Sequence, residues 1–181
     1  MKFNLETERL RLRHFKDSDL ESFLAYRNDP EVARYQGWDV PYPREKALEF
    51  VEEMKIKDPG VQGEWFQAAI EEISTGEMIG DAAYHLKKDE PQAYIGYSIA
   101  RSHWRMGYGK EAIERLLAYL FDELDLHRVI AITDVENFAS FSMLDRLGFR
   151  REGHFVENLR FKGNWGSEYY YGMLKREWES Q

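Results

Sequence analysis

The residue pattern over positions 94–124 constrains the fold more than any other part of the chain. Residues 94–100 are typical of a strand, and an apolar stripe at helical spacing follows from Gly109 onward. The loop between strand and helix contains Gly107 as well. A helix that begins directly after a strand and a glycine loop directs unpaired backbone N–H groups and the positive end of its dipole to one place. The pattern therefore predicts an anion site that suits a pyrophosphate.

This loop is open to two other interpretations. Two glycines by themselves fit an ordinary tight turn, although the stretch is basic within an acidic protein. Residues 107–112 also match the dinucleotide-binding fingerprint, with Asp134 at the end of the next predicted strand, which would indicate a nicotinamide-dependent oxidoreductase. That fold needs several further strand–helix–strand units in a parallel sheet. Only one short helix and an antiparallel hairpin are predicted after residue 133, so the pattern disfavours this alternative.

The remaining elements form one continuous series without an internal repeat or a proline-rich linker. Alternating leucines and arginines predict a strand over residues 9–15, and two helical regions follow up to a break at residues 58–60. The strands and helices predicted after this break cover 65–71, 78–86, 94–100, 109–124, 128–133, 138–147, 151–161 and 168–174. We therefore predict one α/β domain over residues 9–176, with a mixed, largely antiparallel sheet of about seven strands, about four helices and short terminal extensions.

Composition argues against several classes of function. The 181 residues include no cysteine, and the five histidines are not at metal-ligand spacing, so no metal site is predicted. The chain has neither a signal-peptide pattern nor an apolar run long enough to span a membrane, which favours a cytoplasmic protein without a membrane partner. The net charge of -8 disfavours nucleic acid as a partner and favours a cationic substrate.

Several separated motifs resemble the GNAT acetyltransferases, and in particular the RimJ/RimL branch, which is the ribosomal-protein alanine N-acetyltransferase type. Trp-Arg-Met-Gly-Tyr-Gly at 104–109, followed by Glu-Ala, is similar to the family's acetyl-coenzyme A pyrophosphate loop. Asn-Phe-Ala-Ser at 137–140 and Leu-Gly-Phe at 147–149 are similar to its second motif. Residues 9–13 and 28–32 match its opening, so the resemblance extends over nearly the whole chain.

The resemblance implies a GNAT fold with a splayed sheet, in which acetyl-coenzyme A (acetyl-CoA) lies between the strands at 94–100 and 128–133. Backbone groups of residues 98–100 would bind the pantetheine arm, the loop at 105–110 would hold the pyrophosphate, and Asn137 would face the cosubstrate. The cofactor-binding residues predicted in this way are Ser98, Ile99, Ala100, Arg105, Met106, Gly107, Tyr108, Gly109, Lys110 and Asn137.

Proton transfer is assigned to residues near the expected thioester. Ser140 lies in the first turn of a predicted helix, where it either bonds a nearby backbone group or donates a proton to the departing thiolate. Tyr97 and Glu157 are the other candidate catalytic residues. The resemblance leads us to expect an acidic residue at position 94 or 159, where this chain has Tyr94 and Leu159, so the general base is unassigned. Glu157 shares a face with Leu159 only if the strand register allows.

We therefore predict an N-acetyltransferase that transfers an acetyl group directly from acetyl-CoA to a primary amine. A site without an assigned general base suits an α-amine better than a lysine side chain, because about one-seventh of an α-amine is neutral at pH 7. A peptide N-terminus is thus the favoured acceptor, and a polyamine or an aminoglycoside is the small-molecule alternative. A non-catalytic acyl-CoA-binding sensor is a second class of function, because the two acidic positions are missing. The sequence does not decide the oligomeric state, and a homodimer is one of the alternatives.

Overall fold

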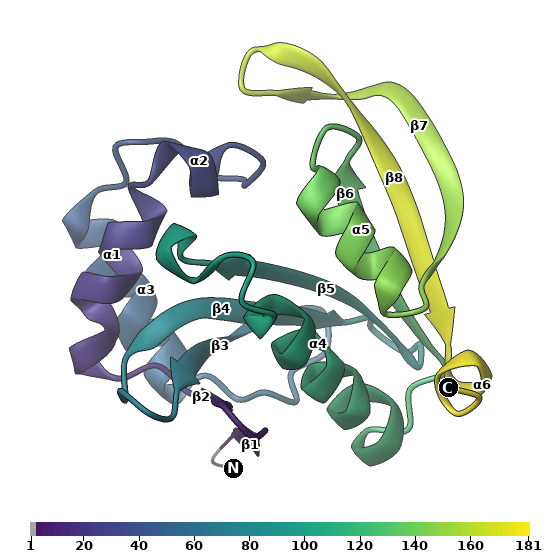
Figure 1. The fold of residues 1–181 in the computed structure, drawn as a ribbon, viewed down its shortest axis with the longest axis horizontal. Coiled ribbons are helices and arrows are strands. Elements are labelled where there is room, and N and C mark those ends of the chain that lie inside the picture. Colours follow the sequence, from purple (N-terminus) through teal and green to yellow (C-terminus); the bar gives the residue numbers. More distant parts are fainter. Residues whose placement is uncertain (1–2) are drawn as a thin grey trace.

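The strands of this chain form an eight-stranded sheet in the order β1-β2-β3-β4-β5-β6-β8-β7, in a computed structural model that describes residues 3–181 (Figure 1). The strands are β1 (Asn4–Glu6), β2 (Leu10–Arg13), β3 (Trp65–Glu72), β4 (Met78–Leu86), β5 (Gln92–Ile99), β6 (Arg128–Asp134), β7 (Arg150–Phe161) and β8 (Asn164–Leu174). β5 and β6 are parallel, and the other neighbouring strands are antiparallel. The predicted mixed, largely antiparallel α/β class is confirmed. A single parallel pair does not fit the doubly wound sheet that the oxidoreductase alternative requires.

Within residues 3–181, six α-helices accompany the sheet: α1 (Leu20–Arg27), α2 (Pro30–Ala33), α3 (Arg44–Ile56), α4 (Tyr108–Ala118), α5 (Phe138–Arg146) and α6 (Lys175–Trp178). The four longer helices are the predicted ones, whereas α2, α6 and β1 are too short to produce a periodic pattern. The long predicted helix is α4 followed by a π-helical turn, Tyr119–Glu123. No helix within residues 3–181 is long and apolar enough to cross a membrane.

Two hydrophobic cores hold the helices against the sheet. α4 and α5 cover one face, where Leu116, Leu117 and Phe121 are completely buried. α1 and α3 pack in a second core, in which the rings of Phe23 and Phe50 stack at a centroid distance of 5.1 Å. Figure 1 shows α1 and α3 beside the first half of the sheet and α5 against its second half. Because the first core includes residues of β1–β5 and the second packs on β3 and β4, this half is a rigid platform for the loop before α4.

The two halves of the sheet separate where β5 and β6 diverge. The parallel pairing joins only the first halves of these strands, from Gln92 with Arg128 to Ile95 with Ala131. In Figure 1, β6, β8 and β7 turn away from β5 beyond this point. The facing edges of β5 and β6 after Ile95 and Ala131 therefore have backbone groups without a partner strand, which confirms the splay that the resemblance implied.

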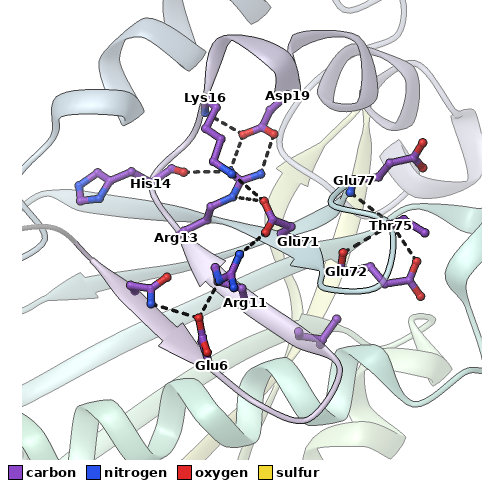
Figure 2. Close-up of polar contacts among 12 residues, drawn as sticks. Glu6, Arg11, Arg13, His14, Lys16, Asp19, Glu71, Glu72, Thr75 and Glu77 are labelled. Carbon is purple, nitrogen blue, oxygen red and sulfur yellow. Dashed lines mark hydrogen bonds and ion pairs between the residues drawn. The ribbon is translucent and has the colours of Figure 1, made fainter.

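A buried ion-pair cluster fixes the N-terminal edge of the platform (Figure 2). Glu71 of β3 accepts hydrogen bonds from Arg13 Nε at 2.6 Å, Lys16 Nζ at 2.8 Å and Arg11 Nη1 at 2.8 Å. Arg13 Nη1 also donates to Asp19 at 2.7 Å. Burial alone would raise the pKa of Glu71, but the hydrogen bonds from Lys16 and Arg13 outweigh it and lower this pKa to about 2.

We expect Glu71→Gln to lower the free energy of unfolding at pH 7 by about 2–3 kcal/mol, because the native state binds the charged carboxylate better than the unfolded chain does. The pKa of Glu71 is lower in the folded state than its ordinary value of 4.5. The stabilisation is therefore complete above about pH 4.5 and is lost as the pH falls toward about 2. Denaturant unfolding of both proteins at pH 7, 4.5 and 3 measures this difference. The control is Glu77→Gln, an exposed neighbour, and an equal difference at all three pH values would contradict the assignment.

Candidate functional site

A cavity of about 150 Å³ occupies the gap where β5 and β6 separate. Tyr97 of β5 and Ser140 of α5 line it at one end, and Glu168 of β8 lines it as well. Successive strand residues point to opposite faces, and Tyr169 and Tyr171 pack into the core beneath α4 and α5. Glu168 therefore points to the opposite face of the sheet, so that the cavity connects the two faces.

Two of the predicted catalytic residues meet at this cavity. The Tyr97 hydroxyl lies 2.8 Å from Ser140 Oγ, at a distance where either group can donate. Burial raises the pKa of Tyr97 to about 12, and the hydrogen bond with Ser140 opposes this only in part. The phenol is thus protonated near neutral pH, and the pair can pass a proton toward a group in the cavity.

Glu157, the third candidate, lies outside this arrangement. It is exposed on β7, and its backbone N–H donates to Ser167 Oγ at 2.8 Å. Its φ of 48° belongs to an irregularity between Phe155 and Leu159, where the register with β8 shifts. Residues two positions apart on a regular strand, such as 157 and 159, point to the same face, but a bulge breaks this alternation. Leu159 consequently lines the cavity, whereas Glu157 is not among the lining residues.

The backbone groups of Ser98 and Ala100 point away from the gap. The Ala100 N–H donates to the Ile79 carbonyl of β4 at 2.8 Å. A Cβ atom on Gly80 would lie 2.2 Å from the Ser98 carbonyl oxygen, so that oxygen also faces β4. Because backbone direction alternates along an antiparallel strand, these two predicted pantetheine-binding residues are engaged with β4.

Ile99 and Tyr97 present their backbone groups to the gap instead. The Ile99 carbonyl accepts a hydrogen bond from Trp104 Nε1 at 2.7 Å, and the Tyr97 carbonyl accepts one from Gln36 Nε2 at 3.2 Å. Both donors come from outside the sheet, so the N–H groups of Ile99 and Tyr97 lie on the same open edge. Of the predicted residues 98–100, only Ile99 thus has its backbone groups on the open edge, and Tyr97 shares that edge; only the strand register reveals this.

The loop before α4 has the backbone conformation that an anion site needs. Gly107 precedes the helix with a φ of 83°, and Arg105 also has a positive φ, 63°. Arg105 and Met106 are exposed. These turns leave the first N–H groups of α4 directed outward at the end of the helix dipole. A pyrophosphate therefore fits the loop, because the glycine backbone allows a close approach that a side chain would block.

Arg9, which the sequence pattern places in a strand, holds this loop from outside. Its guanidinium donates to the Met106 carbonyl at 3.0 Å, pairs with Glu111 at 2.6 Å and lies 4.4 Å from the ring centroid of Tyr108. Tyr108 is buried, and its hydroxyl donates to Glu72. The side chain of Tyr108 is thus an anchor of the loop. No sequence signal indicates the role of Arg9, because the contact spans 97 positions.

The remaining residues predicted to bind the cosubstrate are Gly109, Lys110 and Asn137. A Cβ on Gly109 would lie 3.2 Å from the Met143 sulfur, so Gly109 allows α4 to approach α5 closely. Lys110 pairs with Glu114 on its own helix at 3.0 Å. Asn137 lines the cavity and accepts the Ser140 N–H with its side chain at 3.2 Å, which caps the start of α5.

Segments distant in sequence enclose the cavity on the side away from α5. The hydroxyl of Tyr35 donates to the Glu136 carbonyl at 3.1 Å, and Lys162 Nζ donates to the Ala33 carbonyl at 2.6 Å. Together with the bond from Gln36 to β5, these contacts tie the segment after α2 to both halves of the sheet. Tyr35 and Gln36 after α2 and Leu159 and Phe161 of β7 therefore line the cavity together.

The chain matches the Acetyltransferase (GNAT) domain over residues 9–150 and belongs to this family. It is 31% identical to the uncharacterized N-acetyltransferase p20 of Bacillus licheniformis, over 96% of this chain and 97% of that protein. It is 27% identical to the [ribosomal protein uS5]-alanine N-acetyltransferase of Escherichia coli, over 65% of this chain and 61% of that protein. The GNAT-family acetyltransferase from Bacillus anthracis has the same fold, with a TM-score of 0.85, 29% identity and coverage of 96% and 99%.

Family membership makes this protein an N-acetyltransferase, and the family uses acetyl-CoA as the acetyl donor and an amine as the acceptor. The geometry fits that donor: the loop before α4 suits the pyrophosphate, and the open edge of β5 leads from this loop toward the cavity.

Proposed function

We propose that this enzyme acetylates the α-amine at a peptide N-terminus and belongs to the RimJ/RimL branch, with its activity in one domain over residues 9–176. The observation that carries the proposal is the cavity through the sheet, with a Tyr97–Ser140 hydroxyl pair at one end and acidic Glu168 at the other. The named acceptor of the Escherichia coli relative supports a protein N-terminus. The net charge of -8 favours a cationic acceptor.

In this proposal, each part of the site has one task in a direct transfer. The loop at residues 105–110 binds the pyrophosphate, and the open edge of β5 at Tyr97 and Ile99 binds the pantetheine arm and donates an N–H to the developing oxyanion. The amine nitrogen bonds to the carbonyl carbon while the C–S bond breaks. Ser140 gives a proton to the sulfur, and Tyr97 replaces that proton through their hydrogen bond.

The test is acetylation of a peptide that offers both an α-amine and a lysine side chain, with the modified position located by mass spectrometry. We expect the α-amine to react faster, and cationic residues after the first position to increase the rate through an attraction that added salt weakens. Polyamines and an aminoglycoside complete the panel, and thiol release from acetyl-CoA reports turnover. Preferential lysine modification, or rapid reaction of the small amines alone, would contradict the α-amine assignment. Binding of acetyl-CoA without turnover of any amine would indicate a sensor.

A further inference from the structure

The carboxylate of Glu168 is placed to meet an amine that enters from the face opposite the Tyr97–Ser140 pair. Glu168 lies on β8 directly opposite Asp134, the last residue of β6, and β6 borders the gap. It is half-buried and lines the cavity. An amine between Glu168 and the hydroxyl pair would therefore have a carboxylate on one side and the proton donors on the other.

One neighbour orients this carboxylate without neutralising it. Asn158 of β7 donates its amide to Glu168 Oε2 at 2.6 Å. Over residues 3–181, the structure gives no ion pair between Glu168 and a lysine, arginine or histidine. The other acidic lining residue, Asp134, uses Oδ1 to accept the Glu136 N–H at 2.7 Å. Glu168 thus keeps a net negative charge and Oε1 for a cationic ligand.

The surroundings of Glu168 favour the binding of a cationic ligand. Leu159 and Phe161 line the same cavity, so the nearby walls include apolar side chains. A carboxylate beside such walls binds an ammonium more strongly than it would in open solvent, because the attraction is less screened.

We propose that Glu168 binds the acceptor ammonium and serves as the general base, with Asn158 as its positioning residue. This inference rests on the proposed function and identifies the acceptor as a cationic primary amine. The C–N bond forms and the C–S bond breaks. The ammonium first loses one proton to water, because only the neutral amine attacks the carbonyl. Glu168 takes the second proton as the C–N bond forms and passes it to water, and a proton from water returns to the Tyr97–Ser140 pair to replace the one given to sulfur. A carboxylate is basic enough for this step, because nitrogen becomes far more acidic once it has attacked the carbonyl.

The decisive variant is Glu168→Gln, which keeps the shape of the side chain and removes its charge. We expect kcat/KM for the preferred amine to fall about tenfold or more at pH 7, while the stabilisation by acetyl-CoA is unchanged. The matched control is Glu49→Gln, which makes the same charge change on an exposed residue of α3 and should alter kcat/KM less than twofold. If Glu168→Gln fails to fold by circular dichroism, Glu168→Asp keeps the charge at a shorter reach, and its partial loss of activity provides the same comparison.

The role of Asn158 has its own readout. Asn158→Leu removes the hydrogen bond that orients Glu168, so it should lower kcat/KM in the wild-type background and have no further effect in the Glu168→Gln background. A purely structural role would lower the rate equally in both backgrounds. An unchanged rate in Glu168→Gln, with an active wild-type enzyme, would overturn the inference and leave the proposed function intact. Absence of acetylation of every amine by the wild-type enzyme would instead overturn both.

Discussion

Ser140→Ala is expected to lower kcat by about a hundredfold or more while the affinity for acetyl-CoA stays nearly unchanged. A proton donor to the departing thiolate acts mainly in the transition state, so its removal affects turnover and hardly affects ground-state binding. The arrangement supports this role, because Ser140 lines the cavity and is 2.8 Å from the hydroxyl of Tyr97. Single-turnover kinetics, in which chemistry limits the rate, measure the change.

Variants of the neighbouring residues separate this role from a structural one. Ser142→Ala lies on the same helix α5, outside the residues that line the cavity, and should retain wild-type turnover. Tyr97→Phe should lose less activity than Ser140→Ala, because Tyr97 acts through Ser140. The double variant should be no slower than Ser140→Ala alone, since residues of one relay are not additive. Full activity in Ser140→Ala would leave this serine as a structural helix residue.

Gly107→Val is expected to abolish the stabilisation of the fold by acetyl-CoA. A ligand specific for the native state stabilises the wild-type protein by about 2.7 kcal/mol at 100 times its Kd, which raises the melting temperature by several degrees. Gly107 has a φ of 83°, and a Cβ there would also lie 3.3 Å from the Arg9 guanidinium. A branched side chain would therefore distort the loop that we propose as the pyrophosphate site.

The control must share the backbone strain without touching the loop. Gly76 has a φ of 73° in the turn between β3 and β4, and nothing lies within 4 Å of a Cβ built there. Gly76→Val should lower the melting temperature of the free protein, since a non-glycine residue in this conformation costs about 1–2 kcal/mol. It should nevertheless retain the full shift with acetyl-CoA. Equal shifts in the wild-type protein and Gly107→Val would show that the site assignment is wrong.

Local sequence determined the elements that build the loop site. The strand β5, the glycines before α4 and the helix α5 could each be predicted, because each depends on residues close together in the sequence. The same local rules missed β1 and α2, whose lengths are too short for a period to repeat.

Tertiary structure alone decided which groups face the cavity. Strand register turned the backbone of Ser98 toward β4 and that of Ile99 toward the gap, and a bulge separated Glu157 from Leu159. Glu168 reached the cavity only because β8 inserts between β6 and β7. Register and strand order depend on contacts between distant segments, and a shift of one residue reverses every side chain and backbone group on a strand. The sequence by itself therefore determined the fold class and the glycine loop before α4, whereas the packing of the two halves of the sheet determined the geometry of the cavity.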